Sequence, residues 1–202
     1  MYTKLECSNP VIKSYGGGMG KKKIVFIGGT HGDEPAGAFA INDYNFYGNT
    51  NYEIVTIIVN QCGIDNNTRV NPYTNKDMNR FYGKGDVTNM VIEDIIKDSD
   101  LIIDFHEGYD FHLINKNSIG STLSTETVIP LAKEIKNYLN SYIDDENKFF
   151  SVITNKEEIK GSLREYSESM GLNYILVETT RKYNIDVRVE QCRKIINYVL
   201  SR

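Results

Sequence analysis

The apolar residues of the chain fall into short runs that alternate with stretches of helical spacing. Four runs are rich in β-branched residues, which predicts strands buried on both faces of a sheet. These runs are 24–27, 54–59, 101–105 and 174–177, and a weaker one covers 149–153. Glycine or polar residues follow each of the four, so the predicted strands end where functional side chains can meet.

Between the strands, apolar residues recur three or four positions apart, as on the buried face of a helix. One predicted helix begins directly after Pro35. Four more cover residues 88–97, 124–142, 161–171 and 187–200. We expect Thr88 and Ser162 to cap two of them. Alternating strands and helices predict a single α/β domain over 1–202, with a mostly parallel or mixed twisted sheet and helices on both faces.

Two segments show neither the apolar run of a buried strand nor the apolar spacing of a helix. Residues 1–22 are polar and rich in glycine, so we expect a loose or edge-strand lead into the fold. Residues 61–86 form a long polar stretch, and a loop of this length inside a domain is usually functional. We therefore expect part of a functional site in the second segment.

Composition narrows the possible functions. The 202-residue chain has a net charge of −4 and a pI near 5.5, whereas nucleic-acid binding needs clustered positive charge. No apolar stretch resembles a signal peptide or could cross a bilayer, so we expect neither a nucleic-acid nor a membrane partner. The cysteines, Cys7, Cys62 and Cys192, lack the spacing of a metal or redox site, which predicts reduced thiols in the cytoplasm.

Candidate metal ligands stand at the ends of two predicted strands. His31 and Glu34 follow the first run three residues apart, and His106 directly follows the 101–105 run. Such positions converge on one rim of an α/β sheet, and two histidines with a carboxylate are a usual zinc set. The alternative for His31 is a surface position near a helix-starting acid. For His112, a partly exposed strand position is favoured over metal binding.

Glu178 ends the last predicted strand and is our candidate general base. A base in amide hydrolysis takes a proton from water and returns it to the leaving amine. The alternative is a structural ion pair with Arg181 or Lys182. Position alone does not decide between the two interpretations.

Four motifs stand in order along the chain. They are His31-Gly-Asp-Glu34; Asn60, Gly63, Arg69, Asp77-Met-Asn79-Arg80-Phe81 and Gly83; Asp104-Phe-His106; and Gly161-Ser-Leu-Arg164 with Ile175-Leu-Val-Glu178. Together they resemble the zinc-carboxypeptidase superfamily, and most closely its aspartoacylase and succinylglutamate desuccinylase branch. The match runs from about Lys23 to Arg181. It departs from the family at Gln61, where proline is usual, and at Met78, where leucine is usual.

The resemblance implies chemical roles for the matched residues. His31, Glu34 and His106 would bind one Zn²⁺, although the same ligand set suits cobalt or manganese. Glu178 would be the general base and acid. Arg69 would stabilise the oxyanion that develops beside the metal.

The resemblance also implies substrate-binding residues. Asn79 and Arg80 would hold a substrate carboxylate, to which the planar fork of arginine is suited. Arg164 is a candidate for a further carboxylate, with a structural ion pair as its alternative. Asp77 is expected to orient its loop rather than to touch substrate.

The implied activity is that of a zinc-dependent amidohydrolase that cleaves an amide next to a carboxylate by zinc-activated water. Our first hypothesis is deacylation of a small N-acyl amino acid. The second is carboxypeptidase or amidase action on a peptide, for example of cell-wall type, and the third is a non-catalytic metal- or ligand-binding module. Little of the chain follows Glu178, so we expect the C-terminal lid domain of the family to be absent, which leaves room for a larger substrate.

Overall fold

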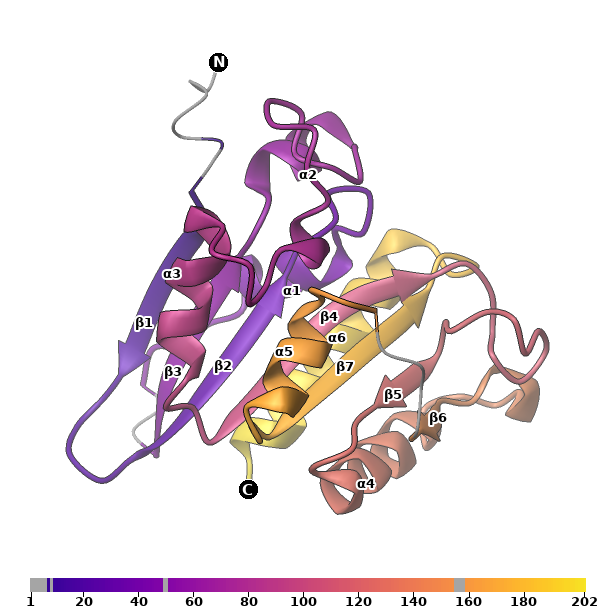
Figure 1. The fold of residues 1–202 in the computed structure, drawn as a ribbon. Coiled ribbons are helices and arrows are strands. Elements are labelled where there is room, and N and C mark those ends of the chain that lie inside the picture. The colour runs from indigo at the N-terminus through magenta and orange to yellow at the C-terminus, as the bar shows by residue number, and fades with distance from the viewer. Residues whose placement is uncertain (1–6, 8, 49–50, 155–158) are drawn as a thin grey trace.

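A computed structural model describes residues 7, 9–48, 51–154 and 159–202 of the chain (Figure 1). Within these residues, seven strands form one mixed sheet. Their bounds are β1 Val11–Gly16, β2 Lys22–Gly28, β3 Tyr52–Ile58, β4 Leu101–Gly108, β5 Thr122–Ser124, β6 Ser151–Ile153 and β7 Tyr174–Thr180. The order across the sheet is β1-β3-β2-β4-β7-β5-β6. The predicted α/β fold is confirmed.

The centre of the sheet is parallel. Strands β3, β2, β4 and β7 run in one direction, whereas β1 pairs antiparallel with β3 and β5 pairs antiparallel with β7. β1 is an edge strand, which is one of the two forms expected for the N-terminal segment. Because the parallel strands end at the same edge, side chains placed after β2, β4 and β7 can meet there.

Helices cover both faces of the sheet, as predicted. Their bounds are α1 Ala36–Asp43, α2 Gln61–Asn66, α3 Val87–Ile96, α4 Ile129–Asn140, α5 Leu163–Ser169 and α6 Ile185–Leu200. Residues of α1, α4 and α6 join the apolar core on one face, and residues of α3 and α5 join the core on the other. In Figure 1, α3 and α5 lie in front of the sheet and α6 lies behind it.

Each face has its own core because side chains alternate along a strand. In β4, Ile103 and Phe105 join the core with α1, α4 and α6, whereas Ile102 joins the core with α3 and α5. Asp104 and His106 are two and four residues from Ile102. They therefore leave the sheet on the α3/α5 side, at the edge where the parallel strands end.

The sequence pattern misses β5 and misplaces the start of α4. Thr122 and Ser124 of β5 are buried polar residues, so no apolar run marks this strand. The helix predicted from residue 124 begins at Ile129, because β5 and the turn after it take the first residues.

The polar segment 61–86 holds more regular structure than predicted. It begins with α2, and a 3₁₀ turn spans Met78–Arg80. Asp86, rather than Thr88, caps α3, because its carboxylate accepts hydrogen bonds from the backbone N–H groups of Thr88 and Asn89. A threonine already inside the first turn cannot supply that cap.

The prediction of reduced thiols is wrong for two cysteines. Cys7 and Cys62 form a disulfide, with Cα atoms 5.4 Å apart although 55 residues separate them in the sequence. The Nδ2 of Asn71 also donates a hydrogen bond of 2.6 Å to the carbonyl oxygen of Cys7. A pairing over this sequence distance leaves no spacing signal. Cys192 is free and buried.

Disulfides are rare in cytosolic proteins, so this bond weighs against the predicted cytoplasmic location, which stays a prediction. Across the described ranges, no helix combines the length and the apolar character needed to cross a membrane. Counting thiols in the unfolded protein tests the disulfide directly.

Candidate metal centre

The turn after β2 carries the first two candidate ligands. β2 ends at Gly28, and the N–H of Glu34 donates a hydrogen bond of 3.1 Å to the carbonyl oxygen of His31. Gly32, between them, lies so close to α2 that a Cβ there would stand 2.0 Å from the carbonyl carbon of Gly63. Only glycine fits this contact, so the motif serves packing as well as chemistry.

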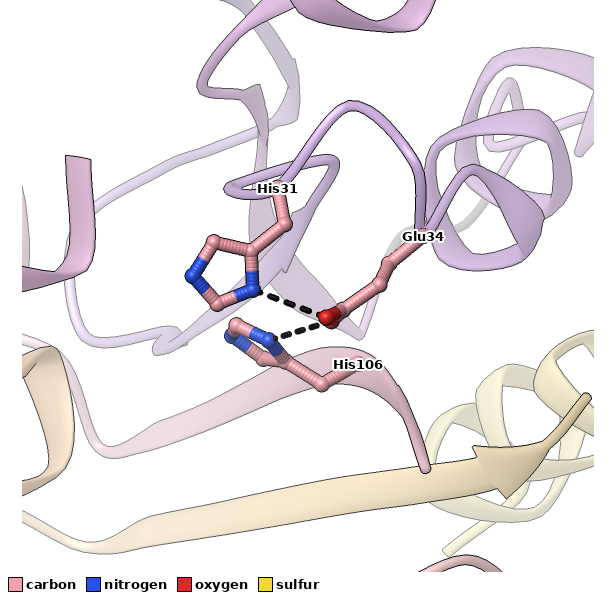
Figure 2. A group of neighbouring side chains, drawn as sticks. All are labelled: His31, Glu34 and His106. Carbon is pink, nitrogen blue, oxygen red and sulfur yellow. Dashed lines mark hydrogen bonds and ion pairs between the residues drawn. The ribbon is translucent and has the colours of Figure 1, made fainter. Parts of the chain in front are cut away.

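Three side chains converge on one point (Figure 2). The Nδ1 of His31 lies 3.0 Å from Oε1 of Glu34, and the Nδ1 of His106 lies 2.8 Å from Oε2. One possible ligand atom from each side chain lies within 4.8 Å of the others, and all three residues are buried. Two imidazoles and one carboxylate suit a four-coordinate cation that keeps one position open.

The far nitrogen of each imidazole faces another carboxylate. The Nε2 of His31 lies 3.1 Å from Oδ1 of Asp77, and the Nε2 of His106 lies 3.3 Å from Oδ2 of Asp104. Both nitrogens of each ring thus face a carboxylate, and when a metal takes Nδ1 the ring proton stands on Nε2, on the side of Asp77 or Asp104. Carboxylates behind histidines are typical of metal sites, so the residues present fit a metal.

The charges of the centre depend on one another. Burial would raise the pKa of Glu34, but hydrogen bonds to His106 and His31 outweigh it and hold that pKa well below its usual range. Burial would raise the pKa of Asp77 as well, but His31, the N–H of Asn79 and the charge of Arg80 together hold that pKa well below its usual range. Burial would lower the pKa of His106, but Asp104 and Glu34 raise it well above its ordinary value. A divalent cation can compensate for these carboxylates in place of protonated imidazole.

Glu178 lies beside the metal ligands. In the parallel β4–β7 pair it is the register partner of His106, so both side chains leave the sheet on the same face. Both residues are buried and line a cavity of about 400 Å³. Arg181, one of the ion-pair partners considered for Glu178, pairs with Asp33 at 3.1 Å and with Glu34 at 3.5 Å.

The other predicted site residues line the same cavity. Its wall includes His31, Glu34, Arg69, Asn79, Arg80, His106, Arg164 and Glu178. The structure thus brings together every residue that the sequence motifs selected for the site.

Arg69 contacts a metal ligand, and Arg80 lies beside Asp77. Nη1 of Arg69 donates a hydrogen bond of 3.0 Å to Oε1 of Glu34, and its Nη2 donates one of 3.4 Å to Asp77. Nη1 of Arg80 donates a hydrogen bond of 2.7 Å to the carbonyl oxygen of Asn79. The two arginine side chains are 44% and 35% exposed, so both guanidinium groups are accessible from the cavity.

Helix α5 fixes the side chain of Asn79. The N–H of Leu163 donates a hydrogen bond of 2.8 Å to Oδ1 of Asn79, which leaves the amide NH₂ to face a ligand. The N–H of Tyr82 donates to the carbonyl oxygen of Gly161, where a Cβ would stand 2.3 Å from the carbonyl oxygen of Arg80. Two motifs far apart in the sequence are thereby held together.

Arg164 is buried and has acidic partners. Its Nε donates a hydrogen bond of 2.7 Å to Glu168, and its Nη2 donates one of 3.1 Å to Glu126. The ion-pair alternative is therefore correct for these two nitrogens. The third, Nη1, has no hydrogen-bond partner among the described residues, although Arg164 lines the cavity.

Sequence reasoning gave no role to Asp104 or Tyr174. The Tyr174 hydroxyl donates a hydrogen bond of 2.8 Å to Oδ2 of Asp104, which backs His106. Asp104 stands two residues before His106, a spacing that places both on one face of a strand and could have identified it. His112 lies outside the centre, with its Nδ1 2.7 Å from the carbonyl oxygen of Ser118.

No protein-family model matches the chain, and no curated protein matches its sequence. Solved structures do match it. Tripeptide-bound cell shape determinant Csd4 of Helicobacter pylori gives a TM-score of 0.82 at 15% identity, over 96% of this chain and 55% of that one. The mDAP-bound form of Csd4, a D,L-carboxypeptidase, gives 0.74 at 16% identity, over 90% and 50%. A succinylglutamate desuccinylase/aspartoacylase from Rhodobacter sphaeroides gives 0.65 at 18% identity, over 94% and 57%.

The chain spans about half the length of these three structures. At such identities the likeness concerns the fold, and it agrees with the superfamily that the four motifs indicated. The chain therefore has a zinc-carboxypeptidase-like fold, with a buried His-Glu-His cluster at the carboxyl edge of its sheet.

Proposed function

We propose that the chain is a zinc-dependent hydrolase that cleaves an amide bond next to a carboxylate. One observation carries the proposal: every residue to which the sequence motifs gave a metal-binding, catalytic or substrate-binding role lines the same cavity. These residues come from four separate parts of the chain, so local sequence alone does not bring them together.

In this proposal His31, Glu34 and His106 hold the metal, the histidines through Nδ1. Zinc held there supplies Lewis acidity, which polarises a carbonyl group and lowers the pKa of water. Glu178 takes the proton of the attacking water and delivers it to the leaving nitrogen. Arg69 donates hydrogen bonds to the negative charge that develops on the carbonyl oxygen.

The carboxylate next to the scissile amide binds to Asn79 and Arg80. The guanidinium of Arg80 and the amide NH₂ of Asn79 are both donors, which suits an anionic group. Nη1 of Arg164, which has no hydrogen-bond partner in the described part of the chain, is the candidate donor for a further carboxylate of the substrate.

Two substrate classes meet this description. A small N-acyl amino acid carries its carboxylate next to the amide, and a cavity of about 400 Å³ is in the range of small-molecule sites. A peptide carries its C-terminal carboxylate next to the last amide, and the tripeptide bound to Csd4, which shares this fold, supports this second class as the desuccinylase/aspartoacylase of the same fold supports the first. A cell-wall peptide is the candidate within it.

The test is hydrolysis of a mixed panel of N-acyl amino acids and short peptides by zinc-loaded protein, with products identified by mass spectrometry. We expect release from one class by the wild type. Glu178→Gln should keep its zinc but lose turnover by about 10²- to 10⁴-fold, the usual contribution of general acid-base catalysis. Glu190→Gln, on α6, is the matched control and should behave as wild type.

Two other outcomes would each contradict a part of the proposal. Zinc loss in Glu178→Gln would show that the metal ligands are assigned wrongly. No hydrolysis of either class by protein that carries stoichiometric zinc would favour the binding-module alternative.

A further inference from the structure

Glu107 is a buried carboxylate that the proposed chemistry does not use. It follows His106 in β4, so strand alternation turns its side chain to the opposite face of the sheet, toward α1 and α6. The side chain is only 1% exposed. A carboxylate buried to this extent needs partners that compensate for lost hydration.

Two reciprocal hydrogen bonds connect Glu107 to the segment that carries the metal ligand Glu34. The N–H of Glu107 donates to Oε2 of Glu34 at 3.2 Å. In return, Oε1 of Glu107 accepts a hydrogen bond of 2.7 Å from the N–H of Ala36, the first residue of α1. The first bond thus holds the Glu34 carboxylate, and the second holds the backbone at Ala36, two residues after Glu34.

Arg188 of α6 supplies the positive partner. Its Nη1 pairs with Oε2 of Glu107, and its own side chain is 14% exposed. The start of α1 is also pressed onto β4, because a Cβ at Gly37 would stand 2.2 Å from Cβ of Phe105. The Ala36 N–H therefore has little freedom to move away from Glu107.

We propose that Glu107, held by Arg188, is a positioning residue that fixes Glu34 in the orientation needed to bind the metal. The inference rests on the metal centre of the proposed function. It assigns Glu107 no contact with substrate. The Glu107 N–H that holds the Glu34 carboxylate is a backbone group and survives substitution. Without the side-chain pair, however, the start of α1 loses its carboxylate partner, so the backbone that carries Glu34 gains freedom relative to the two imidazoles.

The test is the Zn²⁺ dissociation constant, measured by competition with a chromophoric chelator, for wild type, Glu107→Gln, Arg188→Met and Arg188→Lys. Loss of a residue that orients a metal ligand typically weakens binding about 10- to 100-fold. We expect a weakening in this range for Glu107→Gln and Arg188→Met, and substantial rescue in Arg188→Lys, which restores the charge. Cobalt-loaded Glu107→Gln should also show an altered visible absorption spectrum, since the geometry of its carboxylate ligand changes.

Arg193→Met is the matched control. Arg193 lies on the same helix and pairs with Asp43 at 3.1 Å, but it has no contact with the metal ligands. Its zinc dissociation constant should equal that of the wild type. Thermal unfolding without metal separates loss of stability from loss of metal affinity.

A Glu107→Gln protein with lower stability, a wild-type zinc dissociation constant and a wild-type cobalt spectrum would overturn the inference and leave the proposed function standing. A wild-type protein that binds no zinc would instead overturn the metal centre itself. If Glu107→Gln fails to fold, the comparison of Arg188→Met with Arg188→Lys decides the question.

Discussion

The metal side and the carboxylate-binding side of the cavity are built differently. The metal side consists of His31 and Glu34, in the turn after β2, and His106, near the end of β4, and all three are buried. The carboxylate-binding side consists of Asn79, Arg80 and Arg164, which come from the polar segment before α3 and from α5. The strand that carries His106 is paired on both sides, with β2 and β7, whereas the second group is held mainly by contacts between the 3₁₀ turn and α5.

Because of this difference, we expect that zinc affinity and substrate binding can be changed largely independently by substitution. Each imidazole of the metal side has a carboxylate behind it. The carboxylate-binding side is held by the Leu163–Asn79 hydrogen bond and by the Tyr82–Gly161 backbone bond, neither of which involves a metal ligand. Substitutions on one side should therefore change the property of the other side much less than their own, although Nη2 of Arg80 lies 3.7 Å from the Asp77 carboxylate that faces His31.

The largest effect is expected for His106→Ala, on the metal side. The substitution removes one of three ligands, so both stoichiometric zinc binding and hydrolysis should be lost. Zinc content after dialysis, measured by mass spectrometry, checks the first, and the substrate panel checks the second. Full zinc occupancy in this variant would contradict the assignment of His106.

A smaller effect on the same side is expected for Asp104→Asn. The amide keeps an acceptor for the Nε2 of His106 but removes the negative charge, so zinc affinity should fall about 10- to 100-fold. The chelator competition assay measures it. Asp100→Asn is the control, because Asp100 accepts from the N–H of Lys23 near the other end of β4. Equal affinities in the two variants would mean that the charge of Asp104 has no role in metal binding.

On the carboxylate-binding side, Arg80→Met should lower kcat/KM and change zinc affinity far less than Asp104→Asn does, because Arg80 reaches the metal side through its 3.7 Å approach to Asp77. A hydrogen bond to a charged group contributes about 1.5–3 kcal/mol, which corresponds to roughly 10- to 100-fold. Steady-state kinetics on the best substrate of the panel measures the loss. A fall in zinc affinity of similar size would break the separation of the two sides.

The smallest effect on catalysis is expected from the Cys7–Cys62 disulfide. Cys62 lies in α2, and Gly63 of the same helix packs against the turn that carries His31. The disulfide therefore restrains the helix that supports this turn. Cys7→Ser should lower the free energy of unfolding by about 2–4 kcal/mol and leave kcat near the wild-type value. Denaturant titration measures stability. Thiol titration of the unfolded wild type should find one free thiol before reduction, that of Cys192.

The sequence was sufficient for the elements and residues that carry local signals. Apolar β-branched runs marked β2, β3, β4 and β7, because these strands are buried on both faces. The metal ligands could be selected because short motifs place them directly after those runs. Their placement around one cavity agrees with the rule that parallel strands end at one edge.

The features that escaped prediction depend on distant partners. β5 is short and polar, and the disulfide joins cysteines 55 residues apart. Glu107 resembles any strand-end acid until the fold brings Arg188 to it, 81 residues further along. The pattern of a single sequence shows the spacing of residues along the chain. It does not show which distant residue will be the disulfide or ion-pair partner in the folded protein.

The register between β4 and β7 has a consequence for folding. Both strands are apolar on both faces, so a slip of one residue would still bury apolar side chains. The slip would, however, separate Glu178 from His106 and leave the Asp104 carboxylate and the Tyr174 hydroxyl buried without each other. An unsatisfied buried polar group is costly, so this one hydrogen bond disfavours the wrong alignment. Asp104, whose carboxylate faces the metal ligand His106, thus also favours the native register of β4 and β7 during folding.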